Sequence, residues 1–86
     1  MESIDDAVDE VVPSGRERHL LDVRELPPPQ PLQRTLEVLA ELDGGVALVQ
    51  LNDRVPQFLF PKLEDRGYAF ETVEREKVTI TAIWQA

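Results

Sequence analysis

The absence of cysteine sets the first limit on the chemistry open to this chain. Without a thiol the chain has no disulfide, no thiolate nucleophile and no thiolate metal ligand. Its one imidazole, His19, stands near the start of a predicted strand, and a lone histidine does not make a metal site. We therefore predict a non-enzymatic protein with no catalytic residue, no metal and no cofactor.

Asp22 and Arg24 form the first charged pair that could bind something. They flank Val23, and residues two apart in an extended strand point to the same side. The pair could be an ion bridge that braces the following loop. Alternatively, Arg24 could offer its guanidinium to a small anion at the start of the next helix, where free N–H groups attract negative charge.

A proline-rich loop follows this pair. Consecutive prolines fix φ, remove backbone donors and keep each preceding residue extended, so the segment is a stiff loop. Its last proline suits the first position of a helix over 31–42. The residues predicted for a ligand or partner site are Arg24, Pro27, Pro28, Pro29, Pro31 and Leu32.

The remaining elements follow from the apolar spacing. Leucines at helical intervals give the helix over 31–42 one apolar stripe, and Gly44-Gly45 is expected to end it in a left-handed turn. A second helix is expected over 56–66, kinked at Pro61 and closed by Gly67, with Asn52 and Asp53 as its caps. The predicted strands are 19–23, 46–51, 68–73 and 77–85.

The order β-α-β-α-β-β predicts an α+β two-layer sandwich. The first two strands are joined through a helix and should be parallel, whereas the last two form a hairpin. We expect a four-stranded mixed sheet with two helices on one face. The aromatic side chains are interpreted as core rather than as a stacking platform for RNA.

The first sixteen residues differ in composition from the rest. Residues 1–15 contain acidic but no basic side chains and only scattered aliphatic ones. We predict a disordered acidic tail over 1–16 and a domain over 17–86. The alternative is a short helix, because Ile4, Val8 and Val11 recur at helical spacing.

Overall charge restricts the partners. The 86 residues include 17 acidic and 9 basic side chains, a formal net charge of −8. This balance makes nucleic-acid binding unlikely, and sparse lysine beside excess acid would suit a halophile. No apolar run is long enough for a membrane span, so we expect a cytoplasmic protein with no membrane association.

Residues 21–31, which read L-D-V-R-E-L-P-P-P-Q-P, resemble the first motif of the TusA/SirA-like sulfur-carrier family. The similarity is closer to an uncharacterised branch of that family that opens with L-D-V-R-x-L-P-P and has a later N-D, here Asn52-Asp53. The resemblance implies the same β-α-β-α-β-β fold. It places the carriers' reactive cysteine at Pro28, with Pro29 and Pro31 as the motif's two prolines. Leu32 stands where the branch tends to carry a histidine.

The resemblance therefore implies a carrier scaffold without the carrier's nucleophile. We expect a binding or interaction module whose partner is an unknown protein or a small anion. The alternative is an accessory in sulfur relay or redox handling that depends on a partner's thiol. RNA binding is a third and less favoured possibility.

Overall fold

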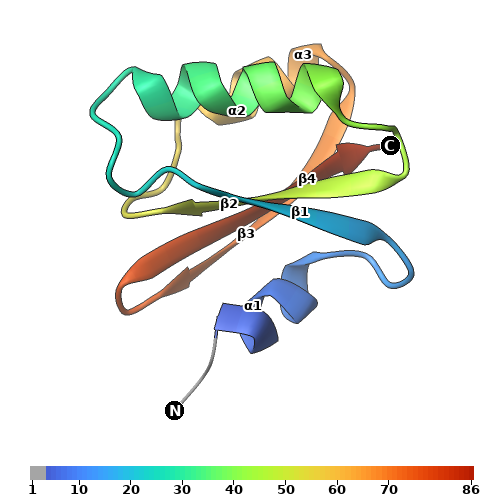
Figure 1. Cartoon of the computed structure of the whole chain (residues 1–86), viewed down its shortest axis with the longest axis horizontal. Coiled ribbons are helices and arrows are strands. Elements are labelled where there is room, and N and C mark those ends of the chain that lie inside the picture. The colour runs from blue at the N-terminus through green and yellow to red at the C-terminus, as the bar shows by residue number, and fades with distance from the viewer. Residues whose placement is uncertain (1–3) are drawn as a thin grey trace.

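A computed structural model of the chain describes residues 4–86 as a four-stranded mixed sheet with helices on both faces (Figure 1). The strands lie in the order β1-β2-β4-β3; β1 is parallel to β2, and β4 is antiparallel to both its neighbours. The predicted four-stranded mixed sheet is confirmed. The elements are α1 (Ile4–Val11), β1 (Glu17–Asp22), α2 (Gln30–Glu41), β2 (Val46–Asn52), α3 (Leu59–Asp65), β3 (Tyr68–Arg75) and β4 (Val78–Gln85).

Helices α2 and α3 cover one face of the sheet, as predicted (Figure 1). The leucine stripe of α2 packs against this face, and removing that apolar surface from water is the main stabilising contribution here. The buried side chains of this core are Val38, Leu39, Leu48, Leu59, Leu63 and Ile83.

Helix α1 covers the opposite face, where the sequence led us to expect a disordered tail and an open sheet (Figure 1). Ala7, Val8 and Val11 are buried against apolar side chains of β2 and β4, among them Val49 and Ile80. An isolated helix of this length would be marginal in water. The apolar sheet face supplies the packing that offsets its ordering entropy.

Two ion pairs hold the acidic side of α1 to opposite edges of the sheet. Asp9 accepts a hydrogen bond from Arg18 of β1 at 2.6 Å, and Glu10 pairs with Arg75 of β3. Asp9 and Glu10 of this acidic segment therefore form ion pairs with arginines of the sheet and do not only interact with solvent.

Coverage from both sides changes the environment of β4. The strand was expected to be half-buried, but its residues 78–83 are all buried. Ile80 and Ala82 face α1, whereas Ile83 faces α2 and α3. The predicted alternation is confirmed, and the added burial comes from α1.

Two helix boundaries differ from those predicted. Helix α3 begins at Leu59, not at residue 56, so Pro61 lies in its first turn, where its N–H would have no intrahelical partner in any case. This placement avoids the expected kink. Helix α2 ends as Leu42 becomes extended, at φ −82° and ψ 146°, rather than through a left-handed glycine at 44 or 45. Gly67, at φ 79°, follows the end of α3 as predicted.

None of the helices within residues 4–86 combines the length and the apolar character needed to cross a membrane.

Candidate ligand-binding groove

A groove of about 520 Å³ lies where the parallel strands β1 and β2 end. Its volume is in the range of small-molecule and cofactor sites. One wall comes from the proline loop and the start of α2, and the other from the loop between β2 and α3. The lining residues are Leu26, Pro28, Pro29, Pro31, Leu32, Gln50, Asn52, Asp53, Arg54, Val55, Pro56, Gln57, Phe58 and Leu59.

Backbone hydrogen bonds stabilise the proline wall, which connects the end of β1 to the start of α2. The N–H of Gln30 donates to the carbonyl of Pro27 at 3.0 Å, and that of Gln33 donates to Pro29 at 3.2 Å. The peptide bond between Pro28 and Pro29 is cis. Because proline has no N–H and a fixed φ, this wall presents apolar rings in a rigid arrangement.

A chain of buried polar side chains forms the floor. Asn52 Nδ2 donates to Gln50 Oε1 at 3.2 Å, and Gln50 Nε2 donates to Thr35 Oγ1 at 2.8 Å. Thr35 Oγ1 donates in turn to the Pro31 carbonyl at 2.7 Å, which connects the floor to the proline wall. Gln50 and Thr35 are fully buried, and Asn52 is 4% exposed. Each buried side-chain nitrogen and oxygen of the floor has at least one hydrogen-bond partner, which fixes the arrangement of these side chains.

Asn52 also shapes the second wall. Its Oδ1 accepts hydrogen bonds from the N–H of Asp53 at 2.8 Å and of Arg54 at 3.3 Å. These bonds close a turn at the end of β2. The prediction that Asn52 and Asp53 cap the second helix is wrong, because α3 begins only at Leu59 and has no side-chain cap.

Phe58 stands at the rim of this wall and is 82% exposed. The other aromatic side chains are partly buried against the two cores, and Phe60 and Phe70 stack at 4.9 Å between ring centroids. The expectation that the aromatics are core residues therefore fails for Phe58. An exposed ring next to prolines is an apolar surface that a ligand can cover.

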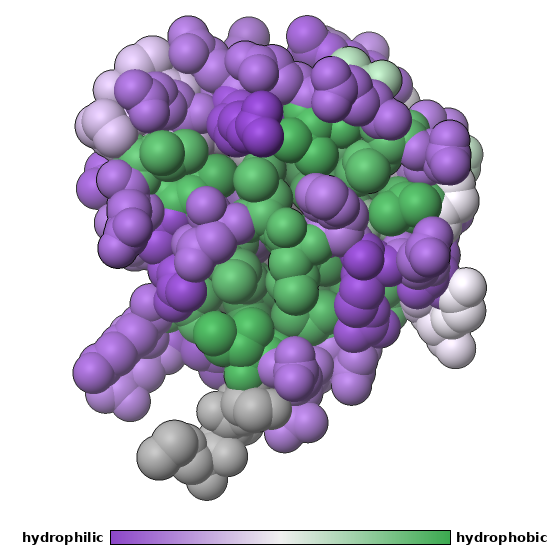
Figure 2. Space-filling model, in the orientation of Figure 1, coloured by the Kyte–Doolittle hydropathy of each residue, from purple (hydrophilic) through white to green (hydrophobic). Residues whose placement is uncertain are grey.

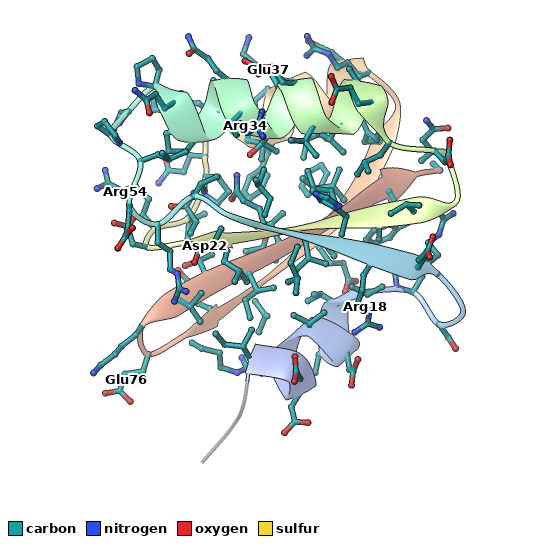
Figure 3. The ribbon with its side chains drawn as sticks, viewed as in Figure 1. Arg18, Asp22, Arg34, Glu37, Arg54 and Glu76 are labelled. Atoms are coloured by element: carbon teal, nitrogen blue, oxygen red, sulfur yellow. The ribbon has the colours of Figure 1, made fainter. Side chains whose placement is uncertain are left out.

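The charged groups near the groove are paired. Asp22 at the end of β1 accepts hydrogen bonds from Arg24 Nε at 3.0 Å and Nη2 at 2.8 Å (Figure 3). Arg54 at the rim lies 3.4 Å from Asp53 (Figure 3). The ion bridge between Asp22 and Arg24, one of the two predicted possibilities, is thus formed.

This bridge has a consequence for the titration of Asp22. The side-chain hydrogen bond from Arg24, followed by the bond from the Arg24 backbone, holds the pKa of Asp22 below its ordinary value of 3.8. A lowered carboxyl pKa stabilises the fold above pH 3.8, and this stabilisation is lost as the pH falls through the folded-state pKa. Because the pair is half exposed, the contribution is less than about 1 kcal/mol.

Replacing Arg24 by alanine is therefore expected to raise the pKa of Asp22 towards its ordinary value. Carbon-detected NMR titration of the Asp22 carboxyl measures this directly. Arg34→Ala, which removes an exposed arginine paired with Glu37 on α2, is the matched control and should leave Asp22 unchanged (Figure 3). An Asp22 pKa unaffected by the loss of Arg24 would contradict this assignment.

The structure places the predicted site residues in two groups. Pro28, Pro29, Pro31 and Leu32 line the groove, together with Asn52 and Asp53 from the other loop. Pro27 and Arg24 do not line it, and Arg24 is engaged by Asp22. His19 is exposed on β1, away from these residues in the strand register.

The polar floor was not predicted from the sequence. Gln50 lies in an otherwise apolar strand, and Asn52 follows it two positions later on the same face. A carboxamide pair at that spacing inside a buried strand was the available signal. In the part of the chain that the structure describes, no three His, Asp or Glu side chains are grouped so as to hold a metal ion.

Comparison with known proteins identifies a family for this chain. No curated protein and no solved structure matches it. One family model, described as an uncharacterised conserved protein, matches residues 20–84, which include the end of β1, the proline loop, the polar floor and all but the last residue of the hairpin. Helix α1 lies outside the match. This match shows that the chain belongs to the uncharacterised conserved family DUF2249.

Proposed function

We propose that this chain is a non-enzymatic binding module whose groove holds an apolar segment of a partner protein. The observation that carries the proposal is the composition of the groove: proline and leucine walls, a polar floor and a ring at the rim, Phe58, that is 82% exposed. Mostly apolar walls with a few fixed polar groups are typical of ligand sites.

The floor also indicates what polar group the ligand would carry. A carboxamide nitrogen has two N–H donors, and Asn52 Nδ2 uses one on Gln50 Oε1. In the described residues no protein acceptor takes the other. A ligand carbonyl at the floor would satisfy it, so we propose an apolar group next to a carbonyl, as in a peptide.

A small anion fits the same groove less well. The anion hypothesis depended on Arg24, and that guanidinium is bound to Asp22 outside the lining. The one arginine in the lining, Arg54, lies beside Asp53, which offsets its charge. We therefore favour an uncharged acceptor.

The resemblance to sulfur carriers suggests a second use of the groove. Pro28 stands at the position of the carriers' cysteine and lines the groove. A partner protein bound there could bring its own thiol to that place, as an accessory in sulfur relay or redox handling. Capture experiments with the chain as bait, under reducing and under oxidising conditions, should enrich a thiol-bearing protein. If no thiol-bearing protein is enriched under either condition, this alternative is contradicted.

Titration with 3-phenylpropanamide, in which two methylene groups join a phenyl ring to one carboxamide, tests the main proposal. In ¹H–¹⁵N spectra we expect saturable shifts at millimolar probe. The shifts should centre on the Asn52 carboxamide and on the backbone of Leu26, Leu32 and Phe58.

Two variants define the specificity of this binding. Phe58→Ala removes an exposed ring and should weaken binding about threefold or more. Gln33→Ala, on the exposed side of α2, is the matched control and should bind like the parent. Shifts that do not saturate, or that centre outside the groove, would contradict the proposal.

A further inference from the structure

Strand β1 forms one edge of the sheet and has an unpaired side. Within residues 4–86, β2 is the strand paired with it. The N–H of Val23 donates to the Leu51 carbonyl at 2.9 Å, so the backbone groups of Val23 point towards β2. Because successive strand residues direct these groups to opposite sides, those of Arg18, Leu20 and Asp22 point away from the sheet.

The same three residues share one face of β1. In the parallel register Leu20 lies beside Val49, whose side chain packs towards α1, so Arg18, Leu20 and Asp22 lie on that face. Leu20 is 52% exposed. Figure 2 shows apolar side chains gathered in the middle of this view, between the two helix layers, where β1 runs across the front in Figure 1. An apolar patch on an unpaired strand edge is a surface for strand addition.

We propose that the occupant of this edge is a second copy of the same chain, joined antiparallel through β1 and centred on Leu20. An antiparallel ladder places outward-facing residues opposite one another. Leu20 then faces Leu20 of the partner subunit, and Arg18 faces Asp22 of the partner subunit. The two-fold axis repeats the charged contact, so one register satisfies both charges in both copies.

Charge complementarity selects this register over its neighbours. A shift by two residues that keeps outward groups opposed moves Leu20 against Arg18 or Asp22 of the partner subunit, and it separates Arg18 from Asp22 of the partner subunit. In the centred register the intrachain pairs extend across the interface. Asp9 pairs with Arg18, and Asp22 pairs with Arg24. The charges therefore alternate in sign along a line from Asp9 to Arg24 of the partner subunit.

The interface would join two four-stranded sheets into one continuous sheet. Three opposed residue pairs, each exchanging two hydrogen bonds, give about six backbone hydrogen bonds. The two leucines at the axis would cover each other. The proposal is independent of the groove, which lies past the end of β1.

A charge-swap experiment tests the proposed register. Light scattering after size exclusion should give the parent chain twice its 9.8 kDa mass. Arg18→Asp places two carboxylates opposite each other, and Asp22→Arg places two guanidinium groups opposite each other. Each variant alone should dimerise roughly tenfold or more weakly. Mixed in equal amounts, they should recover the dimer, because every cross-contact then joins opposite charges.

Leu20→Pro tests the same interface without changing any charge, in case the charge variants fail to fold. The N–H that this substitution removes points away from β2, so the pairing with β2 is retained. The circular dichroism spectrum should remain that of a folded protein while the dimer, which also loses the Leu20 side chain at its axis, is lost. A parent chain that stays monomeric at millimolar concentration would overturn the proposal. Folded single variants that remain dimeric, or a mixture that fails to recover the dimer, would also overturn it.

Discussion

Leu63→Ala is expected to lower the free energy of unfolding by about 2–5 kcal/mol. Leu63 is fully buried in the core between α3 and the sheet, beside Leu48 and Ile83. Truncating it removes apolar contacts and leaves a cavity that the close-packed surroundings fill only in part. Urea unfolding monitored by circular dichroism measures the change as a lower midpoint at an unchanged slope.

Phe58→Ala is the matched control for that experiment. Phe58 is larger than Leu63 but lies mostly in solvent, so its loss should change the unfolding free energy by no more than about 0.5 kcal/mol. Equal effects of the two substitutions would contradict the assignment of α3's inward face.

Val8→Asn is expected to cost about 2–3 kcal/mol, because it places an unpaired carboxamide in the buried contact between α1 and the sheet. Val8 is almost fully buried beside Val11 and Ile80. Since α1 is a short helix, we expect it to detach while the sheet stays folded. Hydrogen exchange should show fast amides over 4–11 and retained protection in β2 and β4.

Asp5→Asn introduces the same side chain at an exposed position of the same helix and serves as the control. It should leave both the unfolding midpoint and the exchange pattern close to those of the parent. Unchanged protection of residues 4–11 in the Val8 variant would mean that α1 is not held by its apolar side.

The sheet and the first long helix were predictable because each carries a clear periodicity. The α2 leucines recur at helical spacing, and Val78, Ile80 and Ala82 alternate with residues that face the other side. The predicted bounds of these elements agree with the structure to within two residues.

Helix α1 differs from the tail expected over 1–16 because its stability is not local. Ile4, Val8 and Val11 have helical spacing, but a short acidic segment gains its packing energy only from a surface that the sequence does not identify. The sheet face that covers it is formed by Val49, Ile80 and their neighbours. The acids that favoured disorder instead pair with arginines of both edge strands.

The groove was predicted on one side only. The prolines marked its first wall because their backbone restrictions are local. The second wall depends on where α3 begins, and the placement of Pro61 in the first turn moved that start to Leu59. The preceding residues became a loop that carries Phe58 to the rim. Side-chain bonds such as that between Gln50 and Thr35 join distant parts of the chain and cannot be read from spacing.

A crystal of the chain soaked with 3-phenylpropanamide tests most directly whether this groove is a binding site. We expect density for the probe there, with its phenyl ring between the proline wall and Phe58. Its carbonyl oxygen should lie within hydrogen-bonding distance of Asn52 Nδ2. An empty groove at saturating probe, or a probe bound only elsewhere on the surface, would contradict it.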